Sequence, residues 1–192
     1  MNNNLKVLKL FADNKDKSFS INKAAQSLHL NYRIAYQEAI KLNAEQLIQM
    51  TKHGNINLCS FKYTYHHKVV ELEEIRKQEV FKHKDLKLIY TRIKEIKNPF
   101  YCLLLFGSYA HKTNQKGSDI DLCLISDNEK TTTEIHSLLS IIPLPIHLQA
   151  FTSEQFLHMI KSKELNVGNE IVENNIILYG LEAFYGMVHH AR

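Results

Sequence analysis

The sequence predicts an α+β protein in which a small, mostly helical unit precedes a mixed sheet flanked by helices. Three observations support this fold class. Residues 1–65 combine helical apolar spacing with one hairpin signal, and residues 66–98 form a charged stretch without glycine or proline. Residues 99–192 alternate strand patterns with helix patterns. We therefore expect three segments with the boundaries 1–65, 66–98 and 99–192.

The first segment is expected to contain three helices and a hairpin. Apolar spacing indicates a helix over residues 5–11, Ser20 is a good N-cap for a second, and a third covers residues 32–42. Strand patterns at residues 47–50 and 56–61 flank a glycine turn. Helix, helix, short turn, helix and hairpin is the order of a winged helix-turn-helix, which this segment resembles.

Charge is distributed unevenly along the chain. Residues 1–65 hold nine Lys or Arg against four Asp or Glu, whereas residues 99–192 hold six against ten. A basic helix-turn-helix attracts the DNA backbone and places its last helix in the major groove, so the resemblance implies a double-stranded DNA partner. The expected contacts are Asn31, Tyr32, Arg33, Tyr36 and Gln37 at the start of the third helix and Lys52 on the hairpin. The alternative is a fold that makes protein contacts only.

The middle segment, residues 66–98, has apolar residues at intervals of three or four over much of its length, which predicts one long helix or two in line. The repeat breaks between Gln78 and Asp85. We expect a rigid connector. The alternative is a coiled coil that forms a homodimer, which would suit a reader of paired DNA half-sites.

The most informative pattern is Gly107-Ser108, followed by ten residues and then Asp119-Ile-Asp121. The glycine lets the strand expected at residues 100–106 turn sharply, and Ser108 begins a short helix whose free N–H groups favour a phosphate. Side chains alternate along a strand, so Asp119 and Asp121 share one face. Two carboxylates at this spacing repel each other unless a cation lies between them, and oxygen ligands suit Mg²⁺ or Mn²⁺ carrying substrate phosphates.

This Gly-Ser and Asp-x-Asp signature resembles the nucleotidyltransferase fold of the DNA polymerase beta superfamily, in particular the small minimal nucleotidyltransferases. The resemblance implies that the Gly-Ser turn holds a nucleoside triphosphate while Asp119 and Asp121 bind two Mg²⁺ ions. Further nucleotide-binding residues are expected at Lys112, Lys116 and Ser118. The alternative interpretation is a solvated Ser-Asp turn that leads into an ordinary strand.

Two departures from the family pattern affect the expected chemistry. Many relatives have arginine where Tyr109 and His111 stand. Active members usually carry a third carboxylate on the next strand, but residues 144–151 contain no acid, and His147 or Gln149 occupies the position. Either His147 accepts the proton of the acceptor hydroxyl, or the site binds a nucleotide without turning it over efficiently.

Two functions follow from these patterns. In the first, the protein transfers a nucleoside monophosphate, with AMP from ATP preferred, to a hydroxyl of a protein or small molecule. The resemblance includes antitoxins that modify a partner toxin in this way, which implies a partner protein as a possible acceptor. In the second, a DNA-binding transcriptional regulator uses a catalytically weak nucleotidyltransferase-like domain to sense a nucleotide.

The remaining elements complete the second half. We expect a helix at residues 131–140, a strand at residues 146–151, a helix that has Ser153 as its N-cap, and a helix from Glu170 to Tyr179 that ends at Gly180.

Composition narrows the cellular setting. The three cysteines are widely spaced and lie in apolar contexts, so we expect them to be reduced. No stretch approaches the ~20 apolar residues of a membrane span, and no signal peptide is visible. We therefore expect a cytoplasmic protein without a membrane partner.

Overall fold

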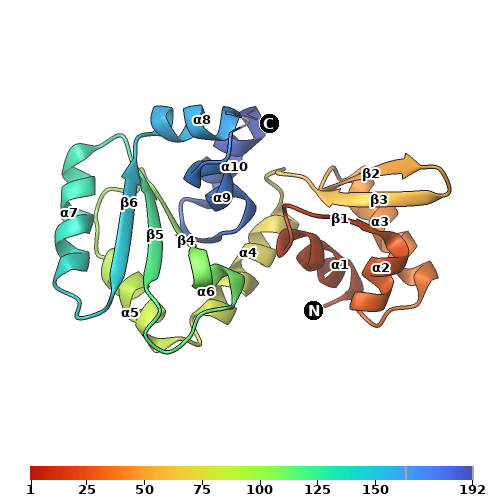
Figure 1. Ribbon diagram of the computed structural model, residues 1–192, viewed down its shortest axis with the longest axis horizontal. Coiled ribbons are helices and arrows are strands. Elements are labelled where there is room, and N and C mark those ends of the chain that lie inside the picture. The colour runs from red at the N-terminus through yellow and green to blue at the C-terminus, as the bar shows by residue number, and fades with distance from the viewer. Residues whose placement is uncertain (163, 192) are drawn as a thin grey trace. The chain divides into compact units, whose positions relative to one another are not determined.

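The computed structural model describes residues 1–162 and 164–191, and the chain divides into two compact units, Met1–Leu72 and Glu73–Arg192. Each unit contains its own sheet, which Figure 1 shows as two separate groups of arrows. Among the described residues, no helix has both the length and the apolar character that crossing a membrane requires.

The first unit combines three helices with a three-stranded antiparallel sheet. In chain order the elements are α1 (Asn3–Ala12), β1 (Ser18–Ser20), α2 (Ile21–Ser27), α3 (Tyr32–Ala44), β2 (Ile48–His53) and β3 (Ile56–Phe61), and the strand order is β1-β3-β2. The three predicted helices and the hairpin are confirmed, while β1 is an additional strand. Each helix has an N-cap whose side chain accepts a hydrogen bond from a backbone N–H of the first turn. The caps are Asn2 for α1, Ser20 for α2 and Asn31 for α3.

The stretch predicted as a connector forms two helices, α4 (His67–Val80) and α5 (Lys84–Ile93), with the break inside the interval where the apolar repeat fails. Leu86, Ile89 and Ile93 of α5 are buried in the hydrophobic core of the second unit. Val69 and Leu72 of α4 are fully buried as well. Because these apolar positions are covered within the chain, they do not form the exposed seam that a coiled-coil dimer would use.

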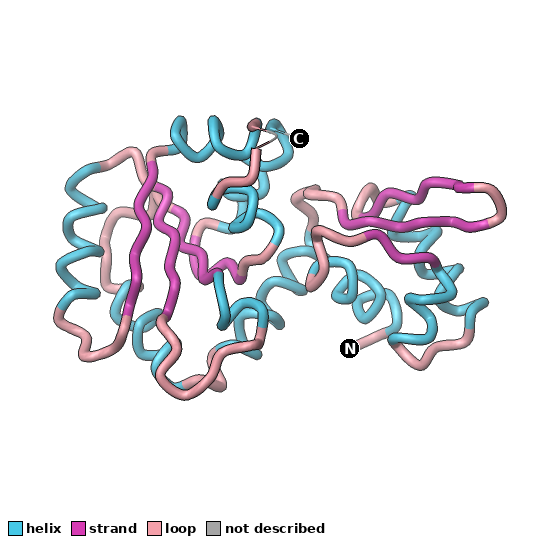
Figure 2. Tube along the Cα trace, in the orientation of Figure 1, coloured by secondary structure: helices cyan, strands magenta, loops and turns pink. Residues whose placement is uncertain are grey.

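The second unit is built on a mixed sheet, as the sequence predicts, and this sheet has one strand more than predicted. Its strands are β4 (Cys102–Phe106), β5 (Ile120–Ile125), β6 (Ile146–Phe151) and β7 (Ile176–Tyr179), in the order β6-β5-β4-β7. Strand β5 is parallel to β6, whereas β4 is antiparallel to both β5 and β7. Figure 2 shows these strands in magenta, with helices on both sides.

Two helical groups cover this sheet. Helices α5 and α7 (Glu129–Ser140) pack against the face that carries Leu103, Leu105 and Leu122. Helices α8 (Ser153–Lys161), α9 (Val167–Glu173) and α10 (Leu181–Ala191) lie together on the other side, with α8 and α10 in contact with the strands (Figure 1).

The predicted helix from Glu170 to Tyr179 is wrong in its second half. Helix α9 ends at Glu173, and Ile176–Tyr179 forms the edge strand β7 against β4. The apolar residues satisfy helix and strand patterns equally over so short a run. Tertiary context decides in favour of a strand, because β4 offers unpaired backbone groups and β-branched residues pack well there.

Two predicted helix boundaries also need correction. Gly180 does not end a helix but joins β7 to α10, with φ +78°. A Cβ at this position would lie 2.4 Å from the carbonyl oxygen of Tyr101, so glycine permits the close approach of two backbones. Thr152, not Ser153, is the N-cap of α8, and it forms a capping box with Gln155.

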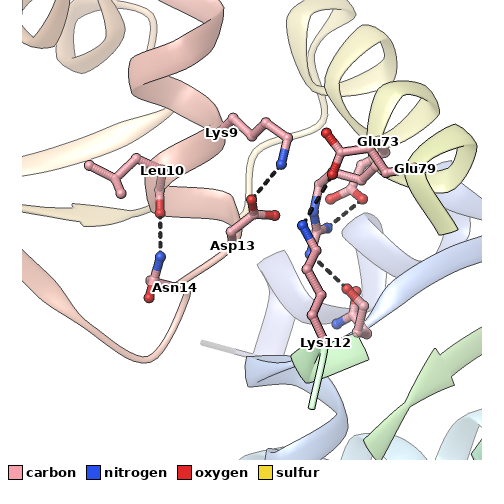
Figure 3. A network of polar contacts seen from close by, with 9 residues as sticks. Lys9, Leu10, Asp13, Asn14, Glu73, Glu79 and Lys112 are labelled. Carbon is pink, nitrogen blue, oxygen red and sulfur yellow. Dashed lines mark hydrogen bonds and ion pairs between the residues drawn. The ribbon is translucent and has the colours of Figure 1, made fainter. Parts of the chain in front are cut away.

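A buried polar network ties α4 to the end of the second unit. Arg76 forms a 2.6 Å ion pair with Glu73 and donates to the carbonyl oxygen of Asn175 at 2.8 Å. The hydroxyl of Tyr185 donates to the other carboxylate oxygen of Glu73 at 2.8 Å. Figure 3 shows Glu73 among side chains whose hydrogen bonds and ion pairs are drawn as dashed lines. The network joins segments that lie far apart in the sequence. Arg76 and Asn175 are 99 residues apart, and Glu73 and Tyr185 are 112 residues apart.

Candidate functional site

The Gly-Ser turn and the Asp-x-Asp strand meet at one end of the second sheet. Phe106, the last residue of β4, is the register partner of Asp121 on β5, so the turn that follows β4 lies beside this carboxylate. Gly107 adopts φ +65°, and a Cβ on it would lie 2.2 Å from Oδ2 of Asp121. Only glycine permits this backbone conformation together with this approach.

His147 lies next to the same carboxylate. Strands β5 and β6 pair Asp121 with His147, and Nδ1 of His147 is 3.8 Å from Oδ1 of Asp121. The histidine side chain is 73% exposed and the aspartate side chain 26%. The predicted neighbours of the site, Gly107, Asp121 and His147, are therefore brought together, and the imidazole is open to a ligand.

Burial and charge act in opposite directions on Asp121. Partial burial raises the pKa of its carboxyl above the ordinary value, the nearby His147 lowers it, and the charge of Asp119 raises it. A cation between the two carboxylates would relieve this repulsion.

The donor atoms of this site fit a divalent cation. Asp119 is exposed and lies immediately before β5, close enough to influence Asp121 electrostatically. Carboxylate oxygens are hard ligands of the kind Mg²⁺ and Mn²⁺ prefer. Within residues 1–162 and 164–191, no cluster of three or more His, Cys, Asp or Glu could hold a metal ion. A cation at Asp119 and Asp121 would therefore complete its coordination with water or substrate oxygens.

Two of the predicted nucleotide-binding residues, Ser108 and Lys112, make contacts within the protein. Helix α6 (Gly107–His111) is short, and the chain folds back so that the Thr113 N–H donates to the carbonyl oxygen of Ser108 at 2.9 Å. Lys112 adopts φ +60° at the end of α6, and its ammonium lies 3.1 Å from a carboxylate oxygen of Glu79 on α4 (Figure 3). The ammonium group of Lys112 is thus already paired with one acid.

The loop that leads to β5 is shaped by Ser118. Its hydroxyl accepts the Gln115 N–H at 2.8 Å, so Ser118 stabilises the loop conformation. Lys116 and Asp119 are exposed on either side of it.

Tyr109 and His111, where the resemblance leads us to expect arginine, have different surroundings. Tyr109 packs partly against the apolar core and makes an edge contact with the ring of His83. The ring of His111 contacts the side-chain amide of Asn174. Both side chains therefore support the fold around the turn.

The candidate DNA contacts lie on the first unit. Tyr36 is half-buried. The other five are exposed, namely Asn31, Tyr32, Arg33, Gln37 and Lys52. Tyr32 stacks on Tyr36 with ring centroids 6.0 Å apart, and Asn31 is committed to capping α3 through the Arg33 N–H. Arg33, Gln37 and Lys52 present their polar groups to solvent.

Sequence reasoning missed Glu79, the partner of Lys112. The two residues are 33 positions apart, and nothing in either local pattern connects them. The charged composition of α4 was the only available signal, and it does not single out one glutamate.

Comparison with known families gives one match. A family model described as "Polymerase beta, Nucleotidyltransferase" matches residues 86–182, which is half of the chain. The matched range contains the Gly-Ser turn, both aspartates and His147, and it does not include the first unit. The comparison with curated proteins returns no match.

Proposed function

Because the chain belongs to the polymerase beta nucleotidyltransferase family, we propose that its second unit transfers a nucleoside monophosphate, with AMP from ATP preferred, to a hydroxyl group. The acceptor is a protein or a small molecule. The contact between Gly107 and Asp121 carries this proposal, because it brings the phosphate-binding turn of the family against a carboxylate suited to a metal ion.

Each group at the site has a proposed role. Asp119 and Asp121 hold Mg²⁺ or Mn²⁺, which when bound supplies positive charge to the triphosphate. Gly107 and Ser108 receive the phosphates, with Lys112, Lys116 and Ser118 on the adjoining loop. The acceptor oxygen forms a bond to the α-phosphorus, the bond from that phosphorus to pyrophosphate breaks, and pyrophosphate leaves.

His147 replaces the third carboxylate as the proton acceptor in this proposal. Its imidazole is exposed, lies within 3.8 Å of Asp121 and can accept the proton that the acceptor hydroxyl loses.

Label transfer tests the proposed activity. Extract is incubated with purified protein, Mg²⁺ or Mn²⁺ and each α-labelled nucleoside triphosphate in turn. We expect a labelled acceptor and pyrophosphate release with wild type, and neither with Asp121→Asn, because the substitution removes a metal ligand from a half-exposed position. Glu134→Gln, which neutralises an exposed carboxylate on α7, is the matched control and should retain transfer. Equal transfer by wild type and Asp121→Asn would disprove the proposed site.

We further propose that the first unit is a winged helix-turn-helix that binds double-stranded DNA. The strand order β1-β3-β2 behind three capped helices fits this fold, and α3 presents Arg33 and Gln37 to solvent. Arg33→Ala should weaken binding to duplex DNA and reduce its dependence on salt, whereas Lys6→Ala on α1 should have a smaller effect. Binding that responds to neither salt nor Arg33 would contradict groove recognition.

The second candidate function is a DNA-binding regulator whose second unit senses a nucleotide. The absence of an acid at residues 146–151 favours it, because the family's third carboxylate is replaced there by an exposed histidine. Under this alternative, nucleotide binding persists without Asp121-dependent transfer, and the nucleotide changes the affinity for duplex DNA.

A further inference from the structure

One helix of the second unit has a charge opposite to that of its surroundings. Residues 82–97 hold six Lys or Arg and two Asp or Glu, whereas residues 99–192 hold six and ten. The segment includes α5 and its flanking turns. Positive charge in the second unit is therefore concentrated on one element.

These charges lie on the outer side of α5. The inner side buries Leu86, Ile89 and Ile93 in the core. The six basic residues are all exposed, namely Lys82, Lys84, Lys87, Arg92, Lys94 and Lys97. Arg92 lies 3.7 Å from Glu95, but in the part of the chain that the structure describes none of the five lysines forms an ion pair. We call these six residues the α5 basic face.

An aromatic cavity adjoins the α5 basic face. It has a volume of about 470 Å³. Its lining is made up of Gln78, Phe81, Lys87, Tyr90, Thr91, Lys94 and Glu95. The rings of Phe81 and Tyr90 lie 4.7 Å apart, and the ammonium groups of Lys77 and Lys94 lie 5.4 and 5.5 Å from the centroid of Tyr90. Cations and aromatic groups thus meet in one open recess.

We propose that the α5 basic face and this cavity bind a single-stranded nucleic acid. The lysines neutralise consecutive phosphates, and one unpaired base enters the cavity beside Phe81 and Tyr90. The bases of a duplex stay stacked, so a duplex could contact only the lysines. A single strand can contact the lysines and also place a base in the cavity. The acidic remainder of the unit repels a polyanion elsewhere, which confines the strand to this face.

This site is distinct from the duplex-binding surface proposed for the first unit and does not depend on catalysis. The α5 basic face belongs wholly to residues 73–192, whereas the duplex contacts belong to residues 1–72. The two proposals can therefore fail independently.

Fluorescence anisotropy with a fluorescein-labelled 20-nucleotide oligouridine tests the proposal on the full chain. The test variant is Lys87→Glu with Lys94→Glu, and the matched control is Lys130→Glu with Lys161→Glu, which changes the net charge equally at exposed lysines of α7 and α8. We expect the test variant to lose at least about tenfold in affinity and to flatten the salt dependence by roughly 0.7 per phosphate contact removed. The control should lose less than about threefold.

Three outcomes would overturn the proposal. Equal losses in the test and control variants would show a general charge effect. An unlabelled DNA duplex of the same length that competes better than oligouridine would assign the binding to the first unit. If the protein binds phosphatidylserine vesicles but not oligouridine, and the test variant loses the vesicle binding, the ligand is an anionic lipid surface.

A second readout locates the base and does not depend on charge-reversal variants folding normally. Oligouridine that contains 4-thiouridine is crosslinked to the wild-type protein by light, and the modified peptides are identified. We expect crosslinks at Phe81 or Tyr90 that disappear in Tyr90→Leu. Crosslinks confined to Tyr32 or Tyr36 of α3 would contradict the cavity.

Discussion

Two carboxylates of the second unit, Glu73 and Asp121, occupy opposite environments. Glu73 is 2% exposed. One of its carboxylate oxygens pairs with Arg76, and the other accepts a hydrogen bond from the Tyr185 hydroxyl. Asp121 is 26% exposed, has the imidazole of His147 at 3.8 Å, and has another acid beside it. One carboxylate is saturated by the protein and the other keeps capacity for a ligand.

The difference separates a structural acid from one that we propose is functional. A buried charge is tolerated only when its partners satisfy it, and removing one partner leaves an uncompensated charge in a medium of low polarity. A pair of acids in contact with solvent repel each other but can bind a cation when one is present. Substitutions at the two places should therefore affect different measurements.

The largest effect on stability is expected from Arg76→Ala. The substitution removes the ion pair to Glu73 and the hydrogen bond to the carbonyl oxygen of Asn175, at a cost of about 3–5 kcal/mol in the free energy of unfolding. Urea unfolding followed by circular dichroism measures it. Arg92→Ala, an arginine of an exposed pair, is the control and should change stability by less than about 1 kcal/mol. If both variants lost the same free energy of unfolding, the buried ion pair would contribute no more to stability than the exposed one.

Gly107→Ala should damage both stability and nucleotide binding. Its φ of +65° disfavours alanine by about 1–2 kcal/mol, and the new Cβ would also displace the Asp121 carboxylate. Gly117→Ala is a matched control, since Gly117 has φ +87° with no atom within 4 Å of an added Cβ. We expect both variants to lose stability in urea, but only Gly107→Ala to lose Mg²⁺-dependent nucleotide binding by calorimetry. Loss in both would assign the effect to backbone strain alone.

Tyr185→Phe should have an intermediate effect that sharpens the description of Glu73. It deletes one donor to a buried carboxylate, at a cost of about 1–3 kcal/mol. Tyr101→Phe removes a hydroxyl whose bond to the carbonyl oxygen of Ile93 is longer, 3.4 Å, and should cost less. Thermal unfolding midpoints rank the two variants, and the reverse order would mean that Tyr185 contributes little to the network.

The smallest effect on stability is expected from Glu79→Gln. The pair with Lys112 is largely exposed, so breaking it should cost at most about 1 kcal/mol. If Lys112 serves the triphosphate as proposed, releasing it from Glu79 should lower KM for the nucleotide and leave kcat unchanged. An increase in KM would instead mean that Glu79 holds Lys112 in its working position.

Local sequence patterns were sufficient for the turn, the two aspartates and most helix starts. A glycine at a strand end, an alternating Asp-Ile-Asp run and Ser20 as a cap act through neighbours within a few residues. The segment from Ile176 to Tyr179 could not be assigned in this way, because its apolar residues suit either periodicity until β4 provides a partner.

The sequence by itself determined the family, the candidate metal-binding aspartates and the order of most elements, since these depend on residue type and short spacing. The tertiary structure alone decided that Gly107 touches Asp121, that His147 faces the same carboxylate and that Lys112 pairs with Glu79. These contacts join residues from 14 to 33 positions apart, and strand register and helix packing set such distances. Local preferences carry no information about them.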